Sequence, residues 1–245
     1  MPPPAPTSTP DLLRRLRALG QPERAAFLAA GYALSAETHW GVPVPAVRRL
    51  ARDTGRALRP APAAEVFAVT DRLLAARVFD ARCLAYEVLA WLAERDQAWA
   101  GRLTAGRLKR LARHLDCWPA TDLLATRLTG PAWRDGRLAD SDLLTWARSR
   151  DPWRRRLALV STVALNLASR GGSGDSRRTL LLADRLARDP DPNVQKGLSW
   201  ALRSLIDHDC KAVESFLHRH DQALPARVRR EVRNKLSTGR KSGKA

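Results

Sequence analysis

The apolar positions of this 245-residue chain recur three and four residues apart from Asp11 onward, and alternating apolar and polar runs are almost absent. Such spacing places apolar side chains on one face of a helix, whereas strands alternate every second residue. A first stripe runs from Leu12 to Leu19 and ends at Gly20, and a second runs from Pro22 to Ala30. Further helices are predicted at 44–53, 62–76, 80–94, 97–115, 119–129, 139–148, 152–169, 176–188, 192–207, 209–220 and 225–236. The chain is therefore predicted to be all-α.

Short connections separate these helices. Asp151-Pro152, Asp189-Pro190 and Asp191-Pro192 each place a capping acid beside a proline that suits a first helical turn. Helix pairs that repeat about every 35 to 45 residues are typical of HEAT-like repeats. We therefore expect a single-domain, right-handed α-α superhelix with a concave basic surface. A compact helical bundle is the alternative, because the repeat is not crisp in the sequence.

The ends of the chain differ in composition from its middle. Residues 1–9 are rich in proline and are predicted to form a disordered leader, and residues 237–245 to form a disordered basic tail. The helical domain is expected to span residues 10–236. The segment from Tyr32 should lead into a loop before Val44, and Gly171 to Asp175 should form a flexible connection.

The charge balance points to a polyanionic partner. The chain has 43 Lys+Arg against 25 Asp+Glu, a formal net charge of +18. The basic residues recur along the whole length, which favours nucleic acid over a membrane surface; a basic surface that serves only solubility is the alternative. Three distant cysteines fit a reducing compartment, and neither a secretory leader nor a bilayer-length apolar run is seen. We expect a cytoplasmic, nucleoid-associated monomer.

The stretch Asp116 to Leu124 carries the first candidate chemistry. Trp118 and Asp122 stand four residues apart at a predicted helix start, so an indole and a carboxylate share one face. A structural interpretation is also open. Pro119 suits the first helical position, which would make Trp118 the flanking cap, and Asp122 would favour the positive end of the helix dipole.

Two groups of arginines lie at predicted helix starts. Arg154, Arg155 and Arg156 follow Asp151-Pro152-Trp153, where the backbone N–H groups already make the helix end positive. Cations in that position favour an external anion such as phosphate, although they can also extend into water or pair with nearby acids. Arg48 and Arg49, near the start of the helix at residue 44, are candidates for the same role.

A third group lies on the helix after Asp191. Lys196, Trp200 and Arg203 follow three and four spacing, which gives an aromatic side chain flanked by two cations. A core tryptophan with cations at the surface would show the same pattern. His114 and Cys117, and the histidines near Cys210, lack zinc spacing, and no serine lies in a nucleophile elbow. We expect no metal site and no cofactor.

Four short motifs, in this order, resemble the HEAT-repeat DNA alkylation-repair glycosylases, the AlkD-like family, over residues 11 to 236. They are Gly-Val-x-x-Pro-x-x-Arg at Gly41 to Arg48, Trp-x-x-x-Asp at Trp118 to Asp122, Trp-x-Arg-Arg at Trp153 to Arg156, and Lys-x-Leu-Ser-Trp-x-Leu-Arg at Lys196 to Arg203. Each motif is short, and their order and spacing make the match specific.

This resemblance implies removal of cationic N3- or N7-alkylated purines from duplex DNA by cleavage of the N-glycosidic bond, without base flipping. It implies that Asp122 stabilises positive charge on the sugar and positions water, that Trp118 and Trp200 pack against the lesion's deoxyribose and backbone, and that Arg156 holds phosphate. A noncatalytic module that binds damaged or branched DNA, and a HEAT scaffold for protein partners, are the other hypotheses.

Overall fold

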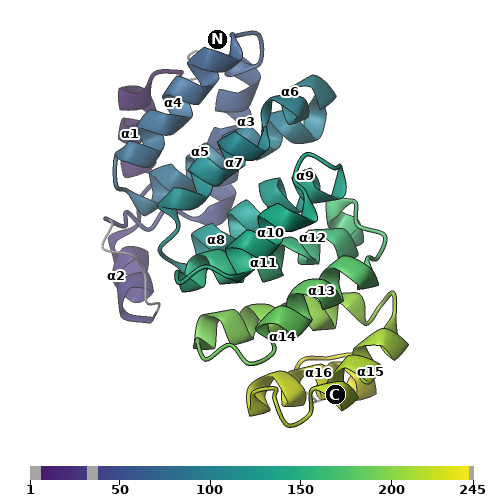
Figure 1. The fold of residues 1–245 in the computed structure, drawn as a ribbon. Helices are drawn as coiled ribbons and strands as arrows, with labels where there is room; N and C mark the ends of the chain where they lie inside the picture. The colour runs from purple at the N-terminus through teal and green to yellow at the C-terminus, as the bar shows by residue number, and fades with distance from the viewer. Residues whose placement is uncertain (1–6, 32–37, 243–245) are drawn as a thin grey trace. The chain divides into compact units, whose positions relative to one another are not determined.

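The structure is a computed structural model that describes residues 7–31 and 38–242, and helices build the fold throughout these ranges (Figure 1). The all-α prediction is confirmed: within the described ranges the one strand-like feature is an isolated bridge between Thr38 and Val78. No helix in them is long and apolar enough to cross a membrane. Residues 32–37 of the predicted loop, residues 1–6 of the predicted leader and residues 243–245 of the predicted tail lie outside the described residues.

Contacts divide the chain into two compact units, Met1–Leu123 and Leu124–Ala245. Unit 1 is built on α5 (Phe79–Arg95), which is buried along most of its length and packs against α3, α4 and α6. Its other elements are α1 (Thr9–Ala18), α2 (Pro22–Gly31), α3 (Val44–Leu58), α4 (Ala63–Ala75), α6 (Gln97–Arg102), α7 (Ala105–Leu111), the 3-10 turn η1 (Ala112–His114) and the start of α8 (Trp118–Leu124).

The predicted helix at 97–115 is interrupted. Leu103 leaves the helical conformation, and the Thr104 side chain accepts a hydrogen bond from the Arg107 amide, which starts α7. A threonine hydroxyl competes for backbone groups in this way, so a helix can begin again within a periodic apolar pattern.

A buried aspartate fixes the approach to α3. The Asp80 carboxylate accepts hydrogen bonds from the Trp40 amide at 2.8 Å and from the Val42 amide at 2.9 Å. Between them, Gly41 has φ +70°, and a Cβ there would lie 2.4 Å from the Gln21 carbonyl oxygen. Only glycine fits this position without strain.

Unit 2 is a succession of helix pairs, which Figure 1 shows from α10 to α16. α10 packs against α11 and α13 against α14, and these are followed by α15 and by α16, which packs against α14. The three groups begin at Asp140, Ser176 and Cys210, close to the predicted repeat. The elements are the π-helical turn η2 (Ala125–Thr129), α9 (Gly130–Arg134), α10 (Asp140–Ala147), α11 (Pro152–Ser161), α12 (Val163–Asn166), the 3-10 turn η3 (Ala168–Arg170), α13 (Ser176–Leu186), α14 (Pro192–Leu205), α15 (Cys210–Arg219) and α16 (Ala226–Thr238).

Two predicted acid–proline caps are confirmed and one is wrong. The carboxylates of Asp151 and Asp191 accept hydrogen bonds from the first amides of α11 and α14, whose first residues are prolines. Asp189 caps no helix. Its carboxylate instead pairs with Arg155, because α14 begins at the second of the two Asp-Pro pairs, Asp191-Pro192.

The predicted flexible connection at Gly171 to Asp175 is an ordered turn. The Gly172 and Gly174 amides donate to the carbonyls of Leu167 and Leu165, and a Cβ on Gly172 would lie 2.5 Å from the Leu165 backbone. The glycines there allow two backbone segments to approach closely. The glycine-rich composition alone had predicted a flexible segment.

The helical region extends slightly beyond its predicted limits. Thr9, placed in the leader, is the first residue of α1, and Ser8 caps that helix through its hydroxyl. Ser237 and Thr238, placed in the tail, are the last residues of α16.

Candidate nucleic-acid interface

In unit 1, α8 presents Trp118 and Asp122. The helix begins at Trp118 itself, one residue earlier than predicted, and the Cys117 carbonyl accepts from the Thr121 amide. Ala120 and Thr121 are fully buried, whereas Trp118 and Asp122 are half-buried. The indole and the carboxylate therefore occupy the part of the first turns of α8 that reaches the surface, as their four-residue spacing predicts.

A π-helical turn follows α8 directly. Thr129, the last residue of this turn, lies with its Oγ1 2.7 Å from Ser161 Oγ on α11. Gly130 comes next, and a Cβ there would lie 2.5 Å from the Ser161 carbonyl oxygen. Isolated π-helical turns are rare and occur often at functional sites. The helix predicted at 119–129 therefore changes to a π-helical turn after Leu124, and this turn packs against α11.

The α3 arginines differ in their availability. Arg48 donates from Nε to Glu87 at 3.2 Å, and that carboxylate is buried on α5. Arg49 is exposed and forms no ion pair within the described ranges. Arg49 therefore presents a cation at the surface, whereas the Arg48 guanidinium is paired with a buried carboxylate.

The three consecutive arginines of α11 have three different environments. The Arg154 side chain is 40% exposed and lies 3.6 Å from the Asp151 carboxylate. Arg155 donates to Asp189 from Nε at 2.6 Å and from Nη2 at 3.2 Å, and its Nη1 donates to the Ser149 and Arg150 carbonyls. These hydrogen bonds to Asp189 raise the pKa of Arg155.

Arg156 is only 5% exposed, and its Nη1 donates to the Asn193 carbonyl in the first turn of α14. Two adjacent arginines thus tie the beginning of α11 to the beginning of α14. Of the three, Arg154 has the side chain most open to solvent.

On α14, a narrow strip reaches the surface. Lys196 is exposed, and Trp200 and Arg203 are half-buried, whereas the residues between them are buried against α11, α13 and α16. The structure therefore brings these three predicted residues together on one side of α14. Burial lowers the pKa of Arg203, although the nearby Glu231 carboxylate acts in the opposite direction.

A buried network lies behind this strip. Ser199 Oγ donates to Glu231 Oε2 at 2.6 Å, and Arg203 Nε donates to Ser199 Oγ at 3.2 Å. Nothing in the sequence indicated Glu231, and the sequence suggested Asp189 only as a helix cap, because the partner of each acid is more than thirty positions away along the chain. The one available signal was Ser199, a polar residue at a position where the helical periodicity predicts a core side chain, because a buried hydroxyl needs a hydrogen-bond partner.

The fold matches that of a solved all-helical structure. A solved structure from Enterococcus faecalis, described as a predicted DNA alkylation repair enzyme, matches with a TM-score of 0.69 at 16% sequence identity, over 89% of this chain and 97% of that chain. No curated protein matches the chain significantly.

The family model for DNA alkylation repair enzymes matches residues 12–236. The chain belongs to this DNA alkylation repair enzyme family, and the resemblance drawn from the four motifs is confirmed at that level.

Proposed function

We propose that this protein is a monofunctional DNA glycosylase that excises cationic N3- or N7-alkylated purines from duplex DNA, without base flipping, as the first step of base excision repair. Membership of the DNA alkylation repair family supports a DNA substrate and a role in alkylation repair. The observation that carries the finer proposal is the shared surface position of Trp118 and Asp122 on α8.

The proposed chemistry is electrostatic. A purine with a fixed positive charge is a good leaving group, so the protein has little need of a general acid. As the N-glycosidic bond breaks, positive charge develops on the sugar, and a nearby carboxylate stabilises it. Asp122 takes this role and positions the attacking water. The indole faces of Trp118 and Trp200 attract cationic groups and pack against the deoxyribose.

Phosphate contacts are assigned to the exposed cations. Among the predicted cations, Lys196 and Arg49 are exposed and form no ion pair with a described residue. Arg154 has 40% of its side chain exposed beside Asp151, and Arg203 lies beside Trp200. Arg156, which the resemblance favours, contacts phosphate in this proposal only through the small part of its side chain that is exposed. Arg48 and Arg155 act mainly through Glu87 and Asp189.

The experiment is an excision assay on a panel of duplexes, each with one alkylated base, in which free base is detected by mass. Release of 7-methylguanine or of an N3-alkylated adenine supports the proposal. The second candidate is a noncatalytic protein that binds damaged DNA, which the basic surface also favours. Tight, salt-dependent binding of the same duplexes without release of any cationic base would establish that candidate instead.

A further inference from the structure

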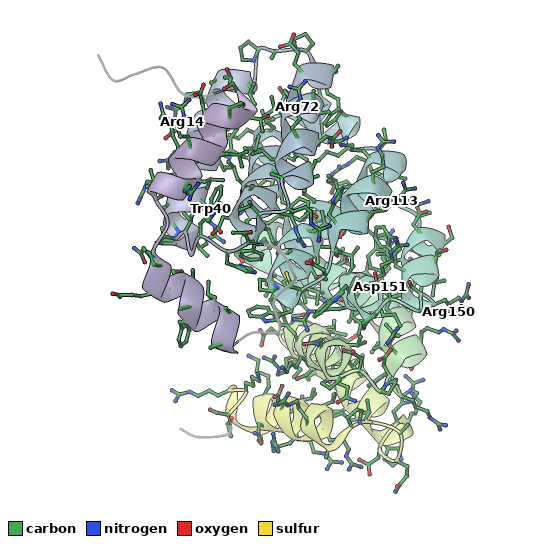
Figure 2. The ribbon with its side chains drawn as sticks, turned by 90° about the vertical axis from the view of Figure 1, so that its left-hand side faces the viewer. Arg14, Trp40, Arg72, Arg113, Arg150 and Asp151 are labelled. Carbon is green, nitrogen blue, oxygen red and sulfur yellow. The ribbon has the colours of Figure 1, made fainter. Side chains whose placement is uncertain are left out.

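The turns that precede α11 and α14 carry more exposed positive charge than the sequence motifs include. Arg148 and Arg150 lie in the turn before α11, and Arg188 lies in the turn before α14. All three are exposed and form no ion pair with any described residue. With Arg154 and Lys196 they make five surface cations, which we call the turn surface. Figure 2 labels Arg150 beside Asp151 at the start of α11.

The acids near the turn surface are already engaged by the protein. Asp151 accepts from the Trp153 amide, and Asp191 accepts from the Asn193 and Val194 amides, as helix caps. Asp189 is buried, with both carboxylate oxygens bound to Arg155. Asp189 is neutralised by Arg155, whereas Asp151 and Asp191 keep their charge as helix caps, and Asp151 also lies 3.6 Å from Arg154. The five cations outnumber these two acids, so the outward charge of the turn surface is positive.

An ion pair joins the two turns. Arg155 donates to the Ser149 carbonyl at 3.0 Å and to the Arg150 carbonyl at 2.9 Å, which fixes the first turn. Asp189 also accepts from the Asp191 amide at 3.0 Å, which fixes the second. The bidentate contact between Arg155 and Asp189 therefore joins the two turns. The planar guanidinium makes that geometry specific. We call this arrangement the Arg155–Asp189 clamp.

We infer that the turn surface binds the phosphate backbone of duplex DNA and that the Arg155–Asp189 clamp is the positioning device that holds its cations in place. This inference rests on the proposed DNA substrate, and it adds Arg148, Arg150 and Arg188 to the interface. Cations held on a fixed backbone lose less freedom on binding than cations on a mobile loop. The clamp itself contacts no DNA.

The test of the surface is the salt dependence of DNA binding. The double variant Arg150→Gln with Arg188→Gln should lower the slope of log K against log salt concentration by about 2, since each lost phosphate contact removes about 0.9. The matched control is Arg177→Gln with Arg219→Gln, which removes two exposed arginines from α13 and α15 of the same unit. Equal slopes for the two double variants would overturn the surface.

The test of the clamp compares the direction in which two substitutions of acids change the affinity for DNA. Removal of an acid from a DNA-binding protein ordinarily strengthens binding, because the net charge rises. Glu214→Gln, an exposed acid on α15 with no partner among the described residues, should behave in that way. Asp189→Asn should weaken binding severalfold despite the same change in charge, and Arg155→Lys should do so with no change in charge. Tighter binding by Asp189→Asn would contradict the clamp.

These outcomes separate the inference from the proposed function. Circular dichroism confirms that each variant is folded, and the surface double variant does not touch the clamp. A wild-type protein that binds DNA through the turn surface but excises no base would remove the glycosylase assignment and leave the surface intact. If the wild type excises base and the surface double variant keeps the wild-type slope, the glycosylase assignment stands and the turn surface is refuted.

Discussion

Ser199 Oγ donates a 2.6 Å hydrogen bond to Glu231 Oε2, and both side chains are buried where α14 packs against α16. Arg203 donates to the same hydroxyl, so a carboxylate near the C-terminal end of the chain is linked to the cation beside Trp200. This link connects the stability of the last helix to the geometry of the candidate interface.

Ser199→Ala should destabilise the protein by about 1 to 3 kcal/mol, because a buried carboxylate oxygen loses its donor. Urea unfolding followed by circular dichroism measures the change. The control is Ser237→Ala on α16, whose exposed hydroxyl donates to the Arg233 carbonyl and should contribute less than about 0.5 kcal/mol. Equal changes in the two variants would mean that the buried network contributes nothing specific.

Gly130→Ala should destabilise unit 2 by about 1 to 3 kcal/mol, because its Cβ would lie 2.5 Å from the Ser161 carbonyl oxygen and 2.6 Å from Ala164 Cβ. Gly106→Ala on α7 is the matched control, since a Cβ there meets no atom closer than 4.0 Å. That variant should be more stable by about 0.5 to 1 kcal/mol. Thermal unfolding distinguishes them, and a stabilising Gly130→Ala would refute the close packing of the π-helical turn.

Burial raises the pKa of Cys117, which directly precedes α8, to about 12. The unfolded chain releases this proton near its ordinary pKa of 9.0, so the buried neutral thiol contributes full stability below that pH. The contribution is lost as the pH rises from about 9 toward 12. Cys117→Ala should therefore show a shallower loss of stability over this window than the wild type, measured by urea unfolding at several pH values.

A thiol titration at pH 8 provides an independent check. Cys210 is exposed and should react with a disulfide reagent in the native protein, whereas Cys117 should react only after unfolding. Rapid reaction of native Cys117 would contradict its buried position.

Apolar periodicity was sufficient to predict the helices, because most of their stability comes from burying one face. It did not show where helices break. The stop at Leu103 and the π-helical turn after Leu124 depend on single polar groups and on close backbone packing. Local caps at Asp151 and Asp191 were predictable, because their partners are two or three residues away.

The sequence predicted which residues form the candidate site, but not which side chains pair with one another. Spacing placed Lys196, Trp200 and Arg203 on one side of α14, which the structure confirms. Spacing did not distinguish Arg154 from Arg155, because the difference lies in Asp189, a residue 34 positions away. Pairings over that distance are set by tertiary packing and leave no local pattern.

Trp200→Ala should slow excision of a cationic base by about 2- to 30-fold, which corresponds to the roughly 0.5 to 2 kcal/mol of an indole–cation contact. The half-buried side chain lies on the exposed strip of α14, so DNA affinity should change less than the rate. Single-turnover kinetics on a 7-methylguanine duplex measure the effect. An unchanged rate would remove Trp200 from the proposed chemistry.

The most direct measurement is the single-turnover rate of 7-methylguanine release by the wild type and by Asp122→Asn, each at saturating protein. Asp53→Asn on α3, which also removes an acid from unit 1, is the matched control. We predict that the wild type and Asp53→Asn release free base at similar rates, and that Asp122→Asn binds the duplex normally but is slower by about 100-fold or more. Release by Asp122→Asn at the wild-type rate would contradict the account.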